Sequence, residues 1–393
     1  MSQTTSKSSR YHSMDIWRGL ACLMIVILHS GHFAYQAAED GPGAAPLILA
    51  ILSRLSVGVP IFFVISGYCI SATTESNASK RGWRSFFYRR FRRIYPPYWI
   101  VACLALLLTT GLSIIGQSDL FSSEYGYFPP PESLSLSQWI GNITLTETWR
   151  PHVFGGPELK ILGIAWTLCY EEQFYFVCGL LLLLKPERFF SGAVFVSVGT
   201  LICTVLFQEQ ISGFFFDGRW LLFAIGILVY YFLNHNKSRA TAIVIFLAMI
   251  VLTGLVRYWP PLAALGESSI ARERKFELFV AALFGGILVA LHPWDIAIAK
   301  SKVLQPLSIC GQMCYSLYLI HWPISVLVSG WMYKSVTQTF WGTVLVSTPL
   351  SIALSLAAGW LFHIAIERRF LNSPVGPAAV TNKNQAKIEL PTA

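Results

Sequence analysis

The chain has 393 residues, of which 54% are hydrophobic and 12% are charged, and its formal net charge is +9. With a mean hydropathy of +0.55, this composition excludes an ordinary soluble globular protein and predicts a polytopic membrane protein. The eight cysteines fall inside apolar stretches without CxxC spacing, so the sequence supports neither a disulfide framework nor a metal site.

Ten apolar stretches are long enough to cross a bilayer, which predicts an all-α fold of about ten transmembrane helices. They cover residues 14–33, 46–72, 94–116, 162–184, 190–207, 217–233, 241–257, 276–292, 304–328 and 341–364. The second and ninth stretches are long enough to be tilted or broken, and Pro60, Pro306 and Pro323 are candidate kinks. Polar residues 1–13 and 371–393 are expected to be tails outside the membrane domain at 14–370, the second of them disordered.

The distribution of Lys and Arg predicts the orientation of the chain. With the amino end in the cytoplasm, the loops on that side hold about twice as many Lys and Arg as the opposite loops, in line with the positive-inside rule. The cluster from Arg272 to Lys275 is the exception. We therefore expect a multi-pass protein of the cell (inner) membrane with both termini cytoplasmic.

An external loop is expected at about 111–160, because this stretch is rich in Ser, Pro, Gly and aromatic residues. Loops of this length are usually functional or disordered. The aromatic residues, such as Trp139 and Trp149, are equally consistent with an ordered flap that stacks on sugar rings and with a segment lying on the bilayer.

The first apolar helix carries charge where a membrane helix usually has none. At 100° per residue, Asp15, Arg18, Cys22, His29 and His32 lie within about 100° of one another and form a polar stripe. Arg18 and His29 are separated by roughly 16 Å along the axis. A charge deep in the bilayer costs about 3 kcal/mol, so the stripe is expected to face a cavity or the bundle interior. The alternative is an Asp15 and Arg18 pair at the interface beside a structural histidine.

A basic segment follows the second apolar stretch, with seven cations between Lys80 and Arg93. It is consistent with attraction to anionic lipid and with a phosphate clamp for a polyphosphorylated cofactor. Neither a P-loop nor a GxGxxG motif is present. Within the second stretch, Ser66 and Gly67 favour close helix packing, and close approach of a ligand chain would use the same small residues.

Two later stretches supply further polar groups. Glu171 and Glu172 are adjacent in an apolar helix, hence about 100° apart, so both cannot face the same groove equally. A carboxylate inside the membrane needs a partner, and Arg18, His29 and His321 are the candidates. A histidine oriented by a carboxylate is typical of a general base. Tyr318 and His321 add polar groups to the ninth stretch.

These residues resemble the membrane-bound acyltransferase family 3, the integral-membrane O-acyltransferases of bacterial surface polysaccharides and some secondary metabolites. The resemblance extends from Asp15 to about Phe370. It rests on Asp15-x-x-Arg18-Gly19 with His29, Phe62-Phe63-x-x-Ser66-Gly67, the stretch from Arg89 to Pro96, Trp166-x-Leu168-x-x-Glu171-x-x-Phe174-Tyr175, Ser316-x-Tyr318-Leu319-x-His321, and Glu367.

The resemblance implies a ten-helix acyltransferase that moves an acyl group, commonly acetyl, from cytoplasmic acyl-CoA to a hydroxyl on the outer side. His29 matches the residue regarded as catalytic in that family. The arginines associated with the donor match Arg18 and Arg89, Arg90, Arg92 and Arg93. The expected partners are acyl-CoA, a glycan acceptor such as a polysaccharide or lipid-linked repeat unit, and membrane lipids; we expect no nucleic acid and no metal.

The residues are consistent with that role. Basic residues would hold the CoA phosphates, Ser66 would line the path of the donor, and His29 would act as general base with Glu171 as a second catalytic group. Asp15, Tyr318 and His321 are expected to line the same pore, and Tyr318, Ser66 and Arg18 are candidate oxyanion donors. A covalent acyl-His or acyl-Cys22 relay is the alternative mechanism.

Two other functions remain open from the sequence. A proton-coupled transporter would use the intramembrane Glu171, His29 and His321 as a proton relay, although no internal repeat with paired broken helices is evident. An acyltransferase acting on a lipid or a secondary metabolite would differ only in its acceptor.

Overall fold

A computed structural model describes residues 11–38, 43–78, 82–116, 128–183, 188–207, 212–235, 238–258 and 269–371. The side chains of residues 76–78, 205, 239 and 252–274 lie outside this description. Within the described ranges all regular structure is helical, which confirms the all-α prediction. Of the two predicted tails, only Tyr11 to Ser13 and Leu371 are described.

The longer helices follow the predicted apolar stretches. They are α1 (Met14–Ser30), α3 (Ala45–Arg54), α4 (Gly58–Ala78), α5 (Gly82–Ile114), α8 (Trp166–Leu181), α9 (Phe189–Phe207), α10 (Arg219–Asn234), α11 (Arg239–Tyr258), α13 (Ser269–Leu291), α15 (Gln305–Gln312), α16 (Cys314–Ser335) and α18 (Thr348–Phe362). Short helices connect them, namely α2 (Phe33–Gln36), α6 (Leu136–Ile143), α7 (Arg150–Phe154), α14 (Asp295–Ala299), α17 (Phe340–Gly342) and α19 (Arg368–Phe370). Single turns of other helix types complete the chain, at η1 (Leu55–Val57), η3 (Pro131–Ser133), η4 (Gly163–Ala165), η7 (Phe215–Asp217), η8 (His292–Trp294), η9 (Thr343–Ser347) and η10 (His363–Glu367).

Several helical stretches are long and apolar enough to cross a membrane, so the chain is a polytopic membrane protein. In the described part of the chain five qualify, namely Met14–Gln36, Ala45–Glu75, Gly82–Ile114, Lys275–Ala299 and Phe340–Phe370, and a sixth does so if α15 and α16 form one bent span. Three shorter apolar helices lie within α9, α10 and α11. The count of about ten therefore stays a prediction.

The breaks in the long stretches do not coincide with the prolines singled out in the sequence. The second stretch is interrupted by η1, and Pro60 falls in the first turn of α4 just after it. In the ninth stretch the axis bends by 81° between α15 and α16, at Met313. Pro323 lies inside the continuous helix α16, and Pro306 lies in the first turn of α15, where proline is tolerated.

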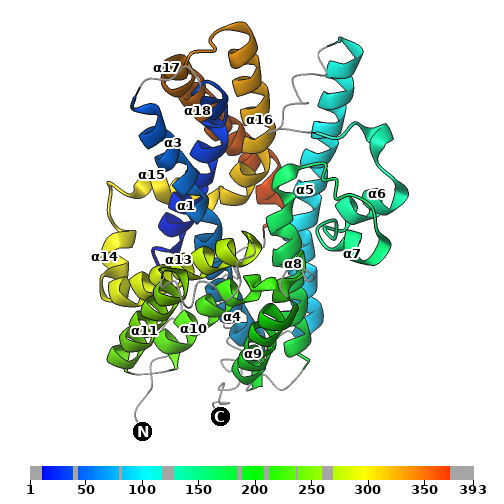
Figure 1. Ribbon diagram of the computed structural model, residues 1–393. Coiled ribbons are helices and arrows are strands. Elements are labelled where there is room, and N and C mark those ends of the chain that lie inside the picture. Colours follow the sequence, from blue (N-terminus) through cyan, green and yellow to red (C-terminus); the bar gives the residue numbers. More distant parts are fainter. Residues whose placement is uncertain are drawn as a thin grey trace, which may run out of the picture.

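Helix α1 packs between α15, α4 and α16 (Figure 1). The contact with α15 is a backbone contact, because a Cβ placed on Gly311 would lie 1.7 Å from the carbonyl oxygen of Asp15. The bend at Met313 then turns the chain, so that α16 also packs against α1. This arrangement brings residues of the first and the ninth apolar stretches together.

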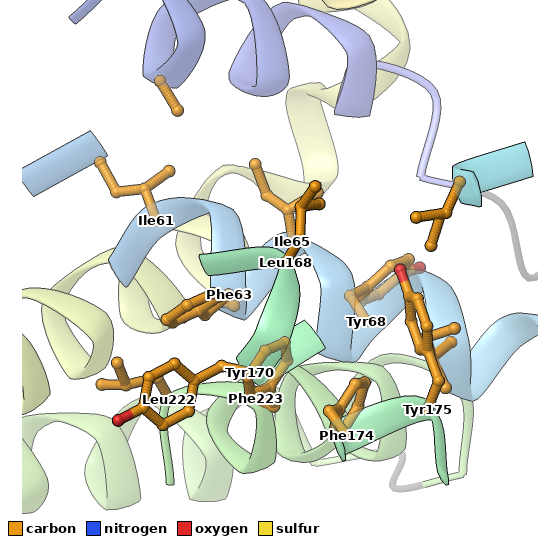
Figure 2. Packing of buried hydrophobic residues seen from close by; sticks show 14 of the residues in the cluster. Ile61, Phe63, Ile65, Tyr68, Leu168, Tyr170, Phe174, Tyr175, Leu222 and Phe223 are labelled. Carbon is orange, nitrogen blue, oxygen red and sulfur yellow. The ribbon is translucent and has the colours of Figure 1, made fainter. Parts of the chain in front are cut away.

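Helices α4, α8 and α10 share an aromatic core (Figure 2). The ring of Phe223 stacks on Phe63 of α4 at 4.5 Å and on Phe174 of α8 at 4.1 Å between ring centroids. At the crossing of α4 and α10, a Cβ on Gly67 would lie 2.0 Å from the carbonyl oxygen of Phe223. The close packing expected at Gly67 is therefore present.

The described part of the predicted external loop, residues 128–160, folds against α5 and is not a structureless connection. The backbone carbonyls of Asn142 and Ile143 accept hydrogen bonds of 2.9 Å from Tyr98 and Trp99 of α5. A buried ion pair joins Glu147 and Arg150, with 2.8 Å between Arg150 Nε and Glu147 Oε2. In Figure 1, α6 and α7 accordingly lie beside the middle of α5. Residues 117–127 of the predicted loop lie outside the described residues.

Candidate active site

A cavity of about 360 Å³ lies between α1, α4, α5, α8 and α16. Apolar side chains form most of its wall, and polar groups occur along it on all five helices. Its polar lining residues are Arg18, His29, Ser56, Ser66, Cys69, Thr73, Arg90, Arg93, Thr167, Glu171, Tyr175, Cys314, Tyr315 and Tyr318. A concave and mostly apolar site with a few convergent polar groups is the usual form of a ligand-binding site.

Three arginines from two helices contribute to the cavity wall. The Arg18 Nη1 atom donates to Asp15 Oδ1 at 3.0 Å, and Nη2 donates to the Cys69 sulfur at 3.0 Å. Arg90 stacks over the Tyr175 ring at 5.1 Å and donates to Thr73 Oγ1 at 3.3 Å. Arg93 lies one turn along α5 from Arg90. This group of guanidinium ions can bind a phosphate or another anion.

Not every cation predicted to hold the donor lines this cavity. Arg92 Nη2 donates to the backbone carbonyl of Arg369 at 2.9 Å, on an exposed face. Arg89 is not among the lining residues either. Asp15 contributes through its ion pair with Arg18 and not as part of the wall. Arg89 and Arg92 do not line the cavity although Arg90 and Arg93 do, because consecutive residues of a helix such as α5 point about 100° apart.

His29 lines the cavity and contacts a second histidine from α16. Its Nδ1 lies 2.9 Å from Nε2 of His321, and the planes of the two rings differ by only 9°. His321 is fully buried, and its Nδ1 lies 3.0 Å from the backbone carbonyl of Leu317. His321 was expected in the pore, but it lies behind His29 and does not line the cavity.

The tautomers of both histidines follow from these contacts. A carbonyl oxygen can only accept, so Nδ1 of His321 carries the proton and Nε2 of the neutral ring accepts. Nδ1 of His29 must then be the donor in the pair. Nε2 of His29 keeps its lone pair, and in the described part of the chain it has no hydrogen-bond partner. An imidazole held in this way is oriented to take a proton from a bound substrate.

Glu171 lines the cavity, whereas Glu172 does not. Ser66 donates to Glu171 Oε1 at 2.9 Å, and Tyr175, one turn along α8, donates to the same oxygen. Glu172 instead accepts a hydrogen bond of 3.3 Å from Tyr95 of α5. The prediction that the two carboxylates face different surroundings is confirmed.

The predicted partner of Glu171 was wrong. Arg18, His29 and His321 were the candidates, but the hydrogen bonds of Glu171 go to the hydroxyls of Ser66 and Tyr175. The side chain of Glu171 meets α4 at Ser66, and α16 supplies the group that orients His29. A second imidazole, and not a carboxylate, therefore orients His29.

Two candidate oxyanion donors already use their hydroxyl hydrogens. Tyr318 lines the cavity and donates to the backbone carbonyl of Ile164, while Ser66 donates to Glu171. The Cys22 thiol donates to the carbonyl of Cys314, with 3.7 Å between sulfur and oxygen, and Cys22 is 2% exposed and does not line the cavity. These contacts argue against Cys22 as the carrier of an acyl group.

Two further residues support the site: Trp322, which the sequence did not single out, and Glu367, which the sequence marked only as part of the family resemblance. Trp322 packs edge-on against His29, with 4.8 Å between ring centroids. Glu367 is 2% exposed, accepts a 2.5 Å hydrogen bond from Ser316 and lies 2.7 Å from His363 Nδ1. Ser316 directly precedes Leu317, whose carbonyl holds His321, so this contact anchors α16 at the base of the histidine pair. The position of Trp322 beside His321 was the available signal for Trp322. The sequence named Glu367 but not its contact with Ser316, because the two residues belong to distant segments.

The pattern of one protein family, described as an acyltransferase domain, matches residues 11–360. The chain belongs to this acyltransferase family. The match includes every helix that lines the cavity. It also confirms the family resemblance seen in the sequence.

Several curated proteins are similar to this acyltransferase family member. O-acetyltransferase OatA of Staphylococcus aureus (strain NCTC 8325 / PS 47) is 25% identical over 76% of this chain and 52% of its own length. The chain thus spans about half the length of that relative. The putative membrane-bound transacylase BcsY of Komagataeibacter xylinus is 25% identical over 97% of this chain and 88% of its own length. Nodulation protein 10 of Rhizobium leguminosarum bv. viciae is 25% identical over 83% and 86%, respectively. No solved structure matches the chain.

Proposed function

We propose that this acyltransferase transfers an acyl group, preferentially acetyl, from acyl-CoA to a hydroxyl group of a glycan. Family membership supports acyl transfer. The names O-acetyltransferase and membrane-bound transacylase, given to two relatives, support transfer to oxygen in a membrane setting. The proton relay of a transporter would not account for this family membership.

The paired histidines carry the proposal. His321 holds His29 in the tautomer whose Nε2 lone pair is available at the cavity. His29 removes the proton of the acceptor hydroxyl while its oxygen attacks the thioester carbonyl carbon. The carbon–sulfur bond then breaks, and the same proton passes to the departing thiolate. The reaction thus forms an ester and a thiol with no net release of a proton.

The arginines of the cavity provide the proposed donor site. Arg18, Arg90 and Arg93 would attract the phosphate groups of acyl-CoA, because guanidinium groups bind phosphate oxygens bidentately. We assign Glu171 and Ser66, which form one hydrogen-bonded unit on the wall, to positioning of the donor chain. The hydroxyls of Ser66 and Tyr175 fix the Glu171 carboxylate, which can still accept a further hydrogen bond from the donor chain.

The proposed site implies an orientation in the membrane. A cytoplasmic donor requires the arginines to be reached from the cytoplasm, in agreement with the positive-inside distribution. We therefore propose the cell (inner) membrane as the location, with both termini cytoplasmic and the acceptor reaching His29 from the opposite side.

The decisive experiment uses purified protein, radiolabelled acetyl-CoA and a crude extract of polysaccharide and lipid-linked oligosaccharide. Wild type is compared with His29→Ala, and binding of CoA is measured for both by calorimetry. We expect label in the extract with wild type, and a loss of about 10²–10⁴ in rate with the variant while CoA still binds. Thioester turnover that is equal in both proteins would remove His29 as the base. No turnover with any acceptor or acyl length would overturn the proposed function.

A further inference from the structure

Arg54 is an exposed cation inside an apolar span, and the proposed reaction does not use it. It ends α3 within the stretch Ala45–Glu75, which is long and apolar enough to cross a membrane. A cation inside such a stretch costs about 3 kcal/mol on insertion scales and usually marks a functional site. In the described part of the chain Arg54 has no acidic partner, and its guanidinium lies 5.7 Å from the centroid of the Phe276 ring.

Contacts with α1 place Arg54 at the level of His29. A Cβ on Gly31 would lie 3.2 Å from the side chain of Leu52, before Arg54, and a Cβ on Gly58 would lie 3.0 Å from the side chain of Ile25. The turn η1 between them therefore lies along the part of α1 that carries His29. Ser56 of this turn is exposed and lines the cavity, so the cavity opens within two residues of Arg54.

A second arginine, Arg219, has its charge balanced by two carboxylates. Arg219 stacks on Trp166, a cavity residue, with its guanidinium 4.5 Å from the ring centroid. Its Nη1 lies 3.5 Å from an Asp217 oxygen and its Nη2 lies 3.6 Å from a Glu277 oxygen. Glu277 follows Phe276, so neighbouring residues of α13 contact Arg54 and Arg219.

We propose that Arg54 binds an oxyanion of the acceptor, a phosphate or a carboxylate, while an acceptor hydroxyl lies at His29. This inference rests on the proposed function. An arginine without an acidic partner can offer both arms of its fork to such a group. The acceptor is therefore an anionic glycan.

The test separates the glycans of an envelope extract from the source organism by anion exchange into a neutral and an anionic fraction. Purified wild type, Arg54→Gln and Arg54→Lys in nanodiscs of zwitterionic lipid are then assayed with radiolabelled acetyl-CoA and each fraction. Arg188→Gln is the matched control. Arg188 is also an exposed arginine at the end of an apolar helix, since it directly precedes α9, and it does not line the cavity. Two pretreatments of the anionic fraction distinguish the sources of charge: mild acid cleaves glycosyl phosphates, and carboxyl reduction neutralises uronic acids.

We expect wild type to label the anionic fraction, and the Gln variant to raise the KM for that fraction about tenfold with little change in kcat. The Lys variant should retain part of the affinity, the Arg188 control should match wild type, and the difference should shrink with salt. One of the two pretreatments should abolish labelling.

Labelling of the neutral fraction alone would overturn the inference and leave the proposed function standing. An equal loss with both fractions in the Gln variant would do the same, since it would show a structural role or a role in lipid contact. If no fraction accepts label from any acyl-CoA with wild type, the proposed function fails and this inference fails with it.

Discussion

His29 owes its chemical state to a residue 292 positions away in the sequence. The stripe on the first helix predicts that His29 faces a cavity, and it does. Its tautomer depends on Leu317 and His321, which reach it because α16 packs against α1. The sequence identified the base candidate but assigned its orientation to a carboxylate, since nothing in the chain order distinguishes Glu171 from His321 as the partner.

The histidine pair predicts different effects for two substitutions of His321. Leu removes the acceptor for Nδ1 of His29, so we expect kcat to fall about 100-fold with the donor KM unchanged. Gln can present its amide oxygen near the position of Nε2 and should retain more activity than Leu. Steady-state kinetics with varied acetyl-CoA measures both parameters. Equal activities of the two variants and wild type would show that His321 does not orient the base.

Neighbouring arginines of α5 predict a contrast in donor affinity. Arg93→Gln removes a charge from the cavity wall and should raise the KM for acyl-CoA about tenfold with kcat little changed. Arg92→Gln is the control, because its guanidinium binds the carbonyl of Arg369 on an exposed face. The measurement is the initial rate at varied acyl-CoA. The donor site is misplaced if Arg92 proves the more sensitive of the two.

At the scale of single elements, close helix contacts depend on small residues. The sequence shows that such residues favour close packing, but it does not show which helix they contact. Gly67 permits the crossing of α4 and α10, while Ser66 beside it lines the cavity. From the sequence, this pair could serve helix packing or the approach of a ligand. In the structure Gly67 serves packing, and Ser66 lines the cavity. The breaks in the long helices were harder to predict, because the bend at Met313 has no proline to mark it.

Two glycine substitutions should separate packing from helix propensity. Gly67→Ala places a Cβ 2.0 Å from the Phe223 carbonyl and should destabilise the fold by about 1–3 kcal/mol. Gly111→Ala adds a Cβ to open space in α5 and should be neutral or stabilise the helix by up to about 1 kcal/mol. Denaturant unfolding in detergent micelles measures both. Similar stabilities for the two variants would contradict the close contact of α4 with α10.

The segment from Phe128 to Lys160 depends on its buried ion pair. Glu147 accepts from two nitrogens of Arg150 and also from the backbone nitrogen of Leu159. Glu147→Gln leaves a buried charge without its partner, which typically costs about 3–5 kcal/mol. We expect faster amide hydrogen exchange within this segment and little change in α18, measured by mass spectrometry. An unchanged exchange pattern would show that the pair does not hold the segment.

At the scale of the whole molecule, the cavity is assembled from five helices that are spread along the chain. The packing of α1 between α4 and α16 places the three arginines and His29 on one cavity. The proposed function takes the donor from the cytoplasm, in agreement with the positive-inside distribution. The orientation of the molecule therefore decides which side supplies acyl-CoA.

Reporter fusions test this orientation. A fluorescent protein fused after Ala393 should fluoresce and alkaline phosphatase fused there should be inactive, because we expect that terminus in the cytoplasm. Phosphatase inserted at exposed Gly156 should be active. The opposite pattern would place the arginines on the outer side and rule out a cytoplasmic donor.

The sequence by itself determined the class of the protein. Its apolar stretches require helices, because a bilayer leaves backbone groups no other way to be satisfied, and the polar stripe of α1 must avoid lipid. Its motifs also determined the family. Only the tertiary structure decided which polar groups meet. Glu171 contacts Ser66 and Tyr175, Arg92 turns away from the cavity, and His321 holds His29. Each of these outcomes depends on the rotation and register of one helix against another, which are set by contacts between segments far apart in the chain.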